Sequence, residues 1–486
     1  MKLLRDVGSV LTALLALYAL VIGVYLIAEN RRPQATLAWM LAFFFAPGIG
    51  VVIYLLFGRD RKAFSKQTKL LRQNLEGNAP PLLTSILARQ DAEIIRLEGK
   101  SPSHRRLMML VRRNSQSALT RRNQVQIQQD AALFYPSLVE DMKAARHSIH
   151  LQYYIWRADS FTEKLKSLLT AKAREGVEVR LLYDAIGSHG RLTWAYVREM
   201  AAAGVRVAPT SPLYRLHTIS YRNHRKITVI DGAIGYTGGM NMGQEHLDGG
   251  PGFDCWHDTQ LRIVGEGAAV LQAVFMVDWY NAVGENLFTD AYHPEAAAEG
   301  TADGVAVQIL TSGPDSQWAA IRQLYASMIA SAQRHVFIQS PFFIPDATIA
   351  DALTTAALAG LDVKLMVSAR ASGNKLAAWA SNTYIADIVG AGVRVFLYEK
   401  GYLHAKTISI DSETCSIGSA NIDIRSFSIN YELNAVLYDE ALARELEGNF
   451  ERDLAHSTEF DLAAYQARSA AVRFRDSLAR LLSPLL

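Results

Sequence analysis

Two residues near the middle of the chain, a histidine and a lysine, have the types and the spacing to act on the same group. His224 and Lys226 lie two positions apart at the start of a β-branched run, which is typical of a strand. Side chains at positions i and i+2 of a strand share a face, so the imidazole and the ammonium would point into one space. An imidazole, with an ordinary pKa of about 6.5, can serve as nucleophile, acid or base, while an ammonium binds an anion.

The same pattern occurs again later in the chain. Each copy has a histidine, a lysine two residues later, an aspartate five residues after the lysine and an asparagine 17 residues after the histidine. The first copy is His224, Lys226, Asp231 and Asn241, and the second is His404, Lys406, Asp411 and Asn421. Two copies that agree at all four positions indicate a functional site. The alternative is a duplicated domain with two surface histidines that serve only its structure.

The segments around the first motif predict an α/β lobe that starts near Val125. Apolar patterns predict helices over 134–145, 161–175 and 193–203 and strands over 147–155 and 177–184. Strands that alternate with helices in this way indicate a largely parallel sheet.

The second motif lies in a repeat of the whole lobe. Helices are expected over 321–333 and 351–359, and strands over 336–340 and 362–367. The sequence Gly-Val-Arg-Val at 204–207 recurs at 392–395. The repeat predicts lobes over 125–290 and 305–460, with a boundary within 286–304.

Two apolar runs, 7–28 and 33–58, precede the lobes and contain no charged residue. Each run is long enough to cross ~30 Å of hydrocarbon as a helix. The short link 29–32 would join them into a transmembrane hairpin over 1–58. A cleaved signal peptide is the alternative for the first run, but a second apolar run follows it at once.

Basic residues gather near both ends of the chain. Those beside the hairpin are Lys2, Arg5, Arg59, Arg61, Lys62, Lys66, Lys69 and Arg72. The positive-inside rule therefore places both ends of the hairpin, and the lobes, in the cytoplasm. Residues 59–124 are expected to form a basic juxtamembrane connector that lies against anionic headgroups. Segment 461–486 mixes arginines with leucines, which predicts an amphipathic segment that packs on the second lobe or lies in the membrane interface.

Composition excludes several classes of protein. The net charge of +3 is too small to indicate a nucleic-acid partner. Only two cysteines, Cys255 and Cys415, are present, so we expect neither a disulfide framework nor a thiolate metal site. The 50% hydrophobic content is high for a soluble protein, and the excess lies at the N-terminus.

The duplicated motif resembles the His-Lys-Asp signature of the phospholipase D superfamily, over about residues 125 to 460. The resemblance implies two tandem α/β lobes, each a mixed sheet flanked by helices, whose motifs meet at a pseudo-twofold axis to make one active site. Four segments resemble the bacterial cardiolipin synthases more closely, namely 222–226, 238–241, 418–426 and 430–432. This resemblance implies a bacterial inner-membrane enzyme that transfers a phosphatidyl group between two phosphatidylglycerol molecules and releases glycerol.

In such a reaction one neutral imidazole attacks phosphorus to form a phosphohistidine, and the other protonates the leaving hydroxyl. We expect His224 to attack, because the segment 222–226 is more cationic than the segment around His404. The superfamily resemblance also favours the first motif. Lys226 and Lys406 would hold the phosphate oxygens, so no metal or other cofactor is expected.

The resemblance also implies supporting residues. Glu432 and Asp258 would orient the histidines, and we expect Glu432 beside His404 and Asp258 beside His224. The other supporting residues are Asn241 and Asn421 as amide donors to phosphate, Ser419 as an optional phosphate contact, and Asp231 and Asp411 as structural residues at turns.

Four other functions are compatible with parts of the sequence. A hydrolytic phospholipase D would use the same residues with water as acceptor, and a phosphatidylserine-forming transferase would use another alcohol. A membrane-tethered nuclease or nucleic-acid binder would need a strongly basic groove with aromatic residues. A non-catalytic membrane scaffold would leave both His/Lys pairs unexplained.

Overall fold

The computed structural model describes residues 17–18, 20–28, 33–46, 50, 54, 80–98, 102–212, 220–250, 252–294, 304–370 and 375–483. The chain forms two units, Met1–Lys66 with Leu213–Ser220, and Gln67–Pro212 with Tyr221–Leu486. Several predicted features lie outside the described residues, namely the start of the first apolar run, the link 29–32, the basic run 59–72 and the boundary segment 295–303.

The first unit contains helical residues 20–28 and α2 (Pro33–Phe45). Leu26, Phe43 and Tyr54 are buried against one another, while Leu41 and Phe44 are exposed. In the described part of the chain, no helix has both the length and the apolar character needed to cross a bilayer. The transmembrane hairpin therefore remains a prediction.

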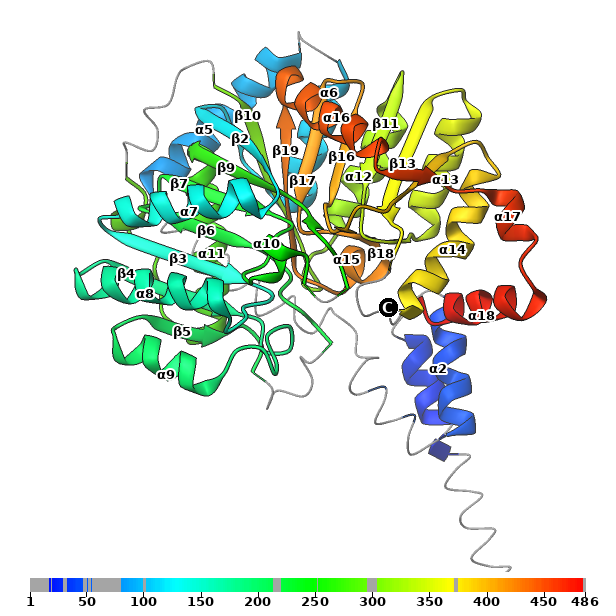
Figure 1. Ribbon diagram of the computed structural model, residues 1–486, viewed down its shortest axis with the longest axis horizontal. Helices are drawn as coiled ribbons and strands as arrows, with labels where there is room; N and C mark the ends of the chain where they lie inside the picture. The colour runs from blue at the N-terminus through cyan, green and yellow to red at the C-terminus, as the bar shows by residue number, and fades with distance from the viewer. Residues whose placement is uncertain are drawn as a thin grey trace, which may run out of the picture. The chain divides into compact units, whose positions relative to one another are not determined.

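The first lobe of the second unit is built on a seven-stranded sheet in the order β2-β9-β7-β6-β3-β4-β5 (Figure 1). The strands are β2 (Asn123–Gln129), β3 (Ser148–Tyr153), β4 (Glu178–Tyr183), β5 (Arg206–Pro209), β6 (Ile227–Ile230), β7 (Ile234–Gly238) and β9 (Thr259–Gly265). Only β3, β4 and β5 pair in parallel, and all other neighbours are antiparallel. The expectation of a largely parallel sheet is thus wrong, because β6 and β7 are joined by a tight turn with no crossover helix. The mixed sheet that the resemblance implied is confirmed.

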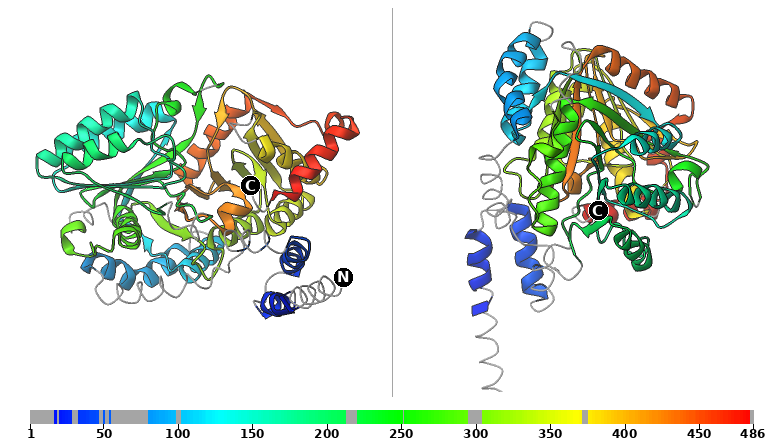
Figure 2. Two further views of the ribbon diagram at one scale, coloured as in Figure 1. Left: turned by 90° about the horizontal axis from the view of Figure 1, so that it is seen from below. Right: turned by 90° about the vertical axis from the view of Figure 1, so that its left-hand side faces the viewer.

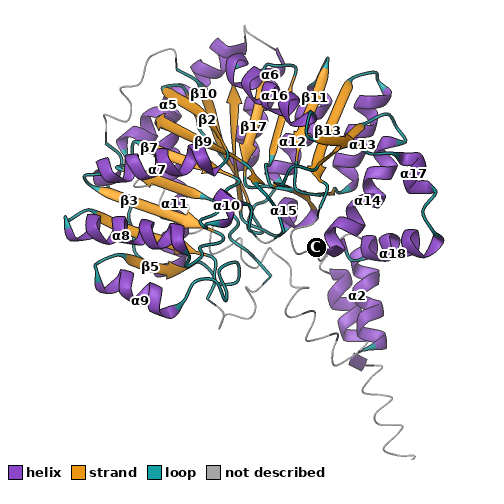
Figure 3. Ribbon diagram, in the orientation of Figure 1, coloured by secondary structure: helices purple, strands orange, loops and turns teal. Residues whose placement is uncertain are grey.

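Helices cover both faces of this sheet (Figure 3). One layer consists of α7 (Ala131–Ala144), α8 (Ser160–Arg174) and α9 (Trp194–Ala202), close to the predicted bounds. On the other face α11 (Glu266–Val283) contacts β3, β6, β7 and β9. A capping box at Asp159 sets the start of α8. The Asp159 carboxylate accepts the Thr162 N–H, and the Thr162 hydroxyl accepts the Asp159 N–H.

The second lobe repeats this order in a nine-stranded sheet, β1-β10-β19-β17-β16-β11-β13-β14-β20. Its strands are β1 (Leu119–Thr120), β10 (Ala306–Ser312), β11 (His335–Gln339), β13 (Asp362–Ser368), β14 (Arg394–Tyr398), β16 (Thr407–Ile410), β17 (Thr414–Gly418), β19 (Glu432–Tyr438) and β20 (Ser457–Glu459). Its flanking helices are α12 (Ala320–Ser331), α13 (Ala347–Leu358), α14 (Lys375–Val389) and α16 (Glu440–Leu454). Short elements of the first lobe include α10 (Glu245–Asp248) and η3 (Asp290–Tyr292), and those of the second lobe include β12 (Phe343–Ile344), β18 (Ile422–Asp423) and α15 (Ile424–Ser428).

Part of the predicted connector belongs to this lobe. Strand β1 pairs with β10 at the edge of the second sheet. Before it, α5 (Pro81–Glu98) contacts α11 of the first lobe, and α6 (Pro102–Ser115) contacts α12 and β10 of the second. The described end of the connector therefore contacts both lobes.

The two lobes share one buried apolar interface. Ile227 and Leu261 of the first sheet lie in the same cluster as Ile417 and Leu433 of the second. Two strand pieces, β8 (Trp256–His257) and β15 (Tyr402–Leu403), pair in parallel across the interface. These contacts fix the position of one lobe against the other, so side chains from both lobes can form a single site.

The C-terminal segment forms α17 (Leu462–Gln466) and α18 (Ala470–Leu481). Helix α18 packs beside α14 through the buried residues Asp476 and Ala479, as expected for packing on the second lobe (Figures 1 and 2). Its opposite face, with Phe474, Leu478 and Leu481, is exposed. An apolar stripe therefore remains on the outside of this helix.

Candidate active site

The structure brings the two predicted motifs together at the interface between the lobes. Lys226 directly precedes β6 and Lys406 directly precedes β16, so the motifs occupy equivalent strand ends. Backbone bonds then join each histidine to the opposite lobe: the His224 N–H donates to the Tyr431 carbonyl at 2.9 Å, and the His404 N–H donates to the His257 carbonyl at 2.7 Å. One composite site with pseudo-twofold symmetry results.

A buried carboxylate lies on Nδ1 of each histidine, and it comes from the opposite lobe. Glu432 Oε2 lies 3.0 Å from His224 Nδ1, and Asp258 Oδ2 lies 2.6 Å from His404 Nδ1. The side chains of both carboxylates are completely buried. The predicted pairing, Glu432 with His404 and Asp258 with His224, is wrong, because the crossed backbone bonds place each carboxylate next to the histidine of the other lobe. In both cases the carboxylate lies on Nδ1, so Nε2 is the nitrogen that could act on a substrate.

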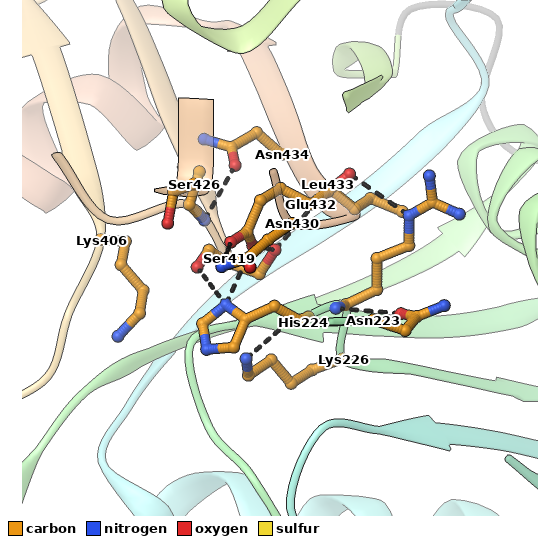
Figure 4. Close-up of polar contacts among 12 residues, drawn as sticks. Asn223, His224, Lys226, Lys406, Ser419, Ser426, Asn430, Glu432, Leu433 and Asn434 are labelled. Carbon is orange, nitrogen blue, oxygen red and sulfur yellow. Dashed lines mark hydrogen bonds and ion pairs between the residues drawn. The ribbon is translucent and has the colours of Figure 1, made fainter. Parts of the chain in front are cut away.

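Glu432 has two further partners in its own lobe (Figure 4). The Ser419 hydroxyl donates to Glu432 Oε2 at 2.5 Å, and the Asn430 amide donates to Oε1 at 3.3 Å. The Ser419 hydroxyl thus holds the carboxylate that orients His224. In the first lobe Gly239 takes the place of Ser419, and a side chain there would collide with Asp258. Sequence reasoning missed the role of Asn430, although it lies two residues before Glu432.

The two lysines are buried next to their histidines. Lys226 Nζ donates to the His224 carbonyl at 2.6 Å, and Lys406 Nζ donates to the His404 carbonyl. Figure 4 shows Lys406 extending from the second lobe toward His224 and Lys226. Burial lowers the pKa of Lys226 to about 7 and that of Lys406 to about 8, and Lys406 also lowers the pKa of Lys226. A bound phosphate would raise both values again by stabilising the charged ammonium groups.

These lysine pKa values predict an alkaline limit for substrate capture. The charged ammonium binds phosphate and exists below the pKa, so kcat/KM should fall as pH rises through about 7 to 8. The kcat limb should lie at higher pH, because bound phosphate raises the lysine pKa values. Initial rates at several lipid concentrations from about pH 5.5 to about pH 9.5 would measure both limbs. A kcat/KM that stays flat to about pH 9.5 would contradict the assignment.

Two premises for the choice of nucleophile change in the structure. Arg225, which made the first motif more cationic, binds Asp278 through Nη1 at 2.8 and 2.7 Å, so its charge is neutralised. Glu432 lies on His224 and not on His404. Neither premise therefore supports His224 as the nucleophile, and the feature that still distinguishes the two histidines is the carboxylate on each.

The charged groups around His224 differ from those around His404. Burial lowers the pKa of His224, although Glu432 opposes this effect. Burial, Lys406 and Lys226 hold the pKa of His404 well below its ordinary value. Burial also raises the pKa of Asp258, whereas His224 and Lys226 outweigh burial and hold the pKa of Glu432 below its ordinary value.

The asparagines of the motif lie at matching strand ends. Asn241 Oδ1 accepts the Ile155 N–H at 3.1 Å, which orients the amide by a backbone bond. Asn421 Oδ1 is buried and has no hydrogen-bond partner among the described residues. Their role as donors to phosphate stays a prediction.

The aspartates of the motif lie at the far ends of the strands from the histidines. Asp231 accepts the backbone N–H groups of residues 146–148, at 2.7 to 2.9 Å, and Asp411 accepts those of residues 333–335, at 2.8 to 3.0 Å. Both have positive φ, 51° for Asp231 and 55° for Asp411. Each carboxylate therefore fixes the start of a neighbouring strand, β3 or β11, which is the structural role expected from the turn.

Aromatic rings that sequence reasoning did not assign surround the histidines. Tyr154 packs edge-on against His224 at 4.7 Å between ring centroids, and Trp256 lies 5.3 Å from His404. Such rings exclude water and strengthen the electrostatic interactions in the site.

Two histidines oriented by buried carboxylates, with two lysines beside them, define the class of two-motif phosphodiester-cleaving enzymes. A family described as the PLD-like domain of cardiolipin synthase matches residues 138–264 and 325–454, and the phospholipase D-nuclease N-terminal family matches residues 14–59. The chain belongs to the PLD-like cardiolipin synthase family of the phospholipase D superfamily.

Bacterial cardiolipin synthases are similar to this chain over almost its whole length. A cardiolipin synthase of Geobacillus thermodenitrificans is 40% identical over 94% of this chain and 90% of its own length. The major cardiolipin synthase ClsA of Bacillus subtilis is 37% identical over 99% of this chain and 100% of its own. A solved phosphatidylserine synthase of Haemophilus influenzae, 14% identical, covers 78% of this chain and all of its own with a TM-score of 0.61, which shows a shared fold.

Proposed function

We propose that the protein is a cardiolipin synthase that joins two phosphatidylglycerol molecules and releases glycerol. The observation that carries the proposal is the crossed site, in which each lobe supplies a histidine, a lysine and the carboxylate for the other lobe's histidine. The full-length similarity to cardiolipin synthases supports the substrate class.

The reaction takes two displacements. Nε2 of one histidine attacks the phosphorus of the first phosphatidylglycerol, the P–O bond to glycerol breaks, and the second histidine gives its proton to the leaving oxygen. The terminal hydroxyl of a second phosphatidylglycerol then attacks the phosphorus of the phosphohistidine and gives its proton to that second histidine. The P–N bond breaks, so cardiolipin forms and the first histidine is free again. Lys226 and Lys406 bind the phosphate oxygens throughout and stabilise the charge that develops on them.

His224 is the better nucleophile of the two histidines, because the carboxylate that contacts it, Glu432, stays ionised. An imidazole that has attacked phosphorus carries positive charge for the life of the intermediate, so it needs a carboxylate that stays ionised. Glu432 meets this need, because its pKa is held low and it accepts bonds from Ser419 and Asn430. Asp258, whose pKa is raised by burial, stabilises an imidazolium less, and the pKa of His404 is held well below its ordinary value. His404 therefore takes up its proton only beside the negative charge of a bound phosphate, and it then gives that proton up readily.

Incubating the purified enzyme with phosphatidylglycerol alone should yield cardiolipin and glycerol without any nucleotide. Because two lysines supply the positive charge at phosphorus, activity should also survive chelation of divalent ions. Mass spectrometry of the lipids and an enzymatic glycerol assay would measure the products. Phosphatidic acid as the sole product would favour the hydrolase, and a loss on chelation that one specific metal reverses would contradict the role given to the lysines.

The enzyme is further proposed to be embedded in the bacterial inner membrane by the hairpin over 1–58, with its lobes in the cytoplasm. The apolar runs, the basic residues beside them and the N-terminal family match over 14–59 support this location. The outward stripe of α18 gives a second surface suited to the interface, since Arg473 and Arg480 flank Phe474, Leu478 and Leu481.

The orientation predicts which engineered cysteines react from outside the cell. With Cys255 replaced by serine, a Lys62→Cys variant should resist an impermeant maleimide in intact cells, because the residue would lie in the cytoplasm. An Asn30→Cys variant, in the link between the apolar runs, should react and serves as the matched control. Labelling of the first variant without the second would reverse the orientation.

A further inference from the structure

A buried cluster of His257, Asp130 and Asp453, next to the half of the site that contains His404, links the two lobes. His257 Nδ1 lies 2.9 Å from Asp130 Oδ1, and His257 Nε2 lies 2.8 Å from Asp453 Oδ2. His257 and Asp130 belong to the first lobe, while Asp453 lies on α16 of the second. Both His257 and Asp453 are buried, with side chains 6% and 9% exposed, and Gln339 Nε2 also donates to Asp453 at 2.8 Å.

The other half contains an equivalent carboxylate with a different cation. Gln152 of β3 and Gln339 of β11 occupy equivalent positions in the two sheets. Gln152 pairs with Ile227 and Gln339 pairs with Thr407, and each of these partners lies three residues after the motif histidine. Gln152 donates to Asp278 at 2.6 Å as Gln339 does to Asp453, so the two aspartates correspond. The cation on Asp278 is Arg225, which stands between His224 and Lys226.

The second motif lacks that cation. Ala405 stands between His404 and Lys406, and no charge comes from this position. His257 supplies it from the opposite lobe, and the equivalent position in the other half is Tyr431, over whose ring the Arg225 guanidinium lies at 5.4 Å. The two halves thus satisfy matching carboxylates with an arginine in one case and a histidine in the other.

His257 is connected to His404 both directly and through Asp258 and Asp130. Its carbonyl accepts the His404 N–H, and the next residue is Asp258, which orients the His404 ring. Asp130, held by His257, accepts the Asp258 N–H at 3.0 Å and donates its own N–H to the Asp258 carbonyl at 2.9 Å. In the other half Arg225 plays a comparable part, since its Nε donates to the Glu432 carbonyl at 3.3 Å.

Only a protonated ring fits these contacts. A neutral imidazole donates from one nitrogen, so one of the two carboxylates would face a lone pair. Among the described residues, the other groups that contact the ring carry no charge: Tyr398 stacks on it at 5.1 Å, and the Gln129 amide, 3.0 Å from Nε2, can turn its oxygen toward it. Although burial lowers it, the bonds to Asp130 and Asp453 raise the pKa of His257 to about 10. Since this value exceeds the ordinary value of about 6.5, the stabilisation is complete below that pH and is lost as pH rises through about 10.

We propose that His257, as an imidazolium held between Asp130 and Asp453, is a positioning residue that fixes the Asp258 carboxylate on His404. The inference rests on the proposed function, because it assigns His404 the proton transfer. It also explains how a second motif without an arginine keeps the geometry of the first.

The test compares His257→Gln with His257→Arg in the full-length enzyme. Loss of the cation should lower kcat for phosphatidylglycerol about 10- to 100-fold with little change in KM, since the lysines still bind phosphate. The loss should shrink in the rate of the first step, measured as the burst of nitrophenol from a phosphatidyl nitrophenyl ester, because that leaving group needs no proton. His257→Arg should recover most of the activity, because a guanidinium serves the equivalent carboxylate at Asp278.

His335→Gln is the matched control, because His335 also pairs with a carboxylate, Glu447 at 2.9 Å, but lies at the start of β11 away from the histidines of the site. This control should lower stability and leave kcat unchanged. Equal losses with both substrates, no recovery by His257→Arg, or unchanged kcat in His257→Gln would each overturn the proposal.

If His257→Gln does not fold, Asp453→Asn removes one of the two negative charges that hold the imidazolium and should show the same dependence on the leaving group. The wild-type arm separates the two hypotheses. A wild type that makes no cardiolipin rejects the proposed function, while the nitrophenyl assay still reports on the role of His257.

Discussion

Replacing His224 with alanine should lower phosphatidyl transfer at least about 10⁴-fold, because the variant loses the atom that bonds to phosphorus. Binding should change less, since Lys226 and Lys406 still hold the phosphate. The measurement is the rate of cardiolipin formation, together with the affinity for phosphatidylglycerol from a competition assay. A residual rate within about 100-fold of wild type would exclude His224 as an essential nucleophile.

The covalent adduct distinguishes the two histidines. A labelled phosphatidyl ester with a good leaving group, quenched early, should leave its label on the peptide that contains His224. The same adduct should form in His404→Ala, because that leaving group needs no proton, and should persist there because the base for the second step is missing. Label on His404 in the unmodified enzyme would reverse the two roles and leave the two-step mechanism intact.

Replacing the buried carboxylates should also cost much of the activity, about 10³- to 10⁴-fold for Glu432→Gln, because an amide neither stabilises the imidazolium nor holds the tautomer. Asp258→Asn should cause a similar loss with phosphatidylglycerol. The crossed geometry makes the two variants separable. Since Glu432 serves His224 and Asp258 serves His404, a good leaving group should rescue adduct formation in Asp258→Asn and not in Glu432→Gln.

Glu447→Gln is a suitable control for this pair, because it removes a carboxylate from a histidine away from the site. It should affect stability alone. Ser419→Ala should fall between the extremes, with about a tenfold loss, because Glu432 keeps its Asn430 bond. If the leaving group rescues Glu432→Gln and not Asp258→Asn while the label maps to His224, the crossed pairing would be contradicted.

Local sequence signals were sufficient for several helices and strands of each lobe, although α11, α14 and α16 were not predicted. The helices near 161–175 and 193–203 begin at polar residues that cap them, Asp159 and Thr193, and follow an apolar period that a single chain segment shows by itself. The repeat of the lobe was likewise legible, because duplicated residues keep their spacing. Whether neighbouring strands run parallel or antiparallel was not predicted correctly, because a hairpin turn and not a crossover helix joins β6 to β7.

The same division holds for the site. Spacing by itself placed His224 with Lys226 and His404 with Lys406, because side chains two apart on a strand share a face. It also put Asp231 and Asp411 at turns, where the backbone N–H groups that they accept begin the neighbouring strands. These relations are local or repeat within one lobe, so a linear sequence contains them.

Contacts between residues far apart in the sequence, most of them between the lobes, decided the rest. The exchange of Glu432 and Asp258, the neutralisation of Arg225 by Asp278 and the bridge of His257 to Asp453 all join residues at least 53 positions apart. Their charges act through distance in space inside a low-dielectric interior, where one buried partner changes a pKa or cancels a charge. The sequence by itself therefore indicated the histidines, lysines and carboxylates of the candidate site, and only the packing of one lobe against the other determined which carboxylate lies on which histidine.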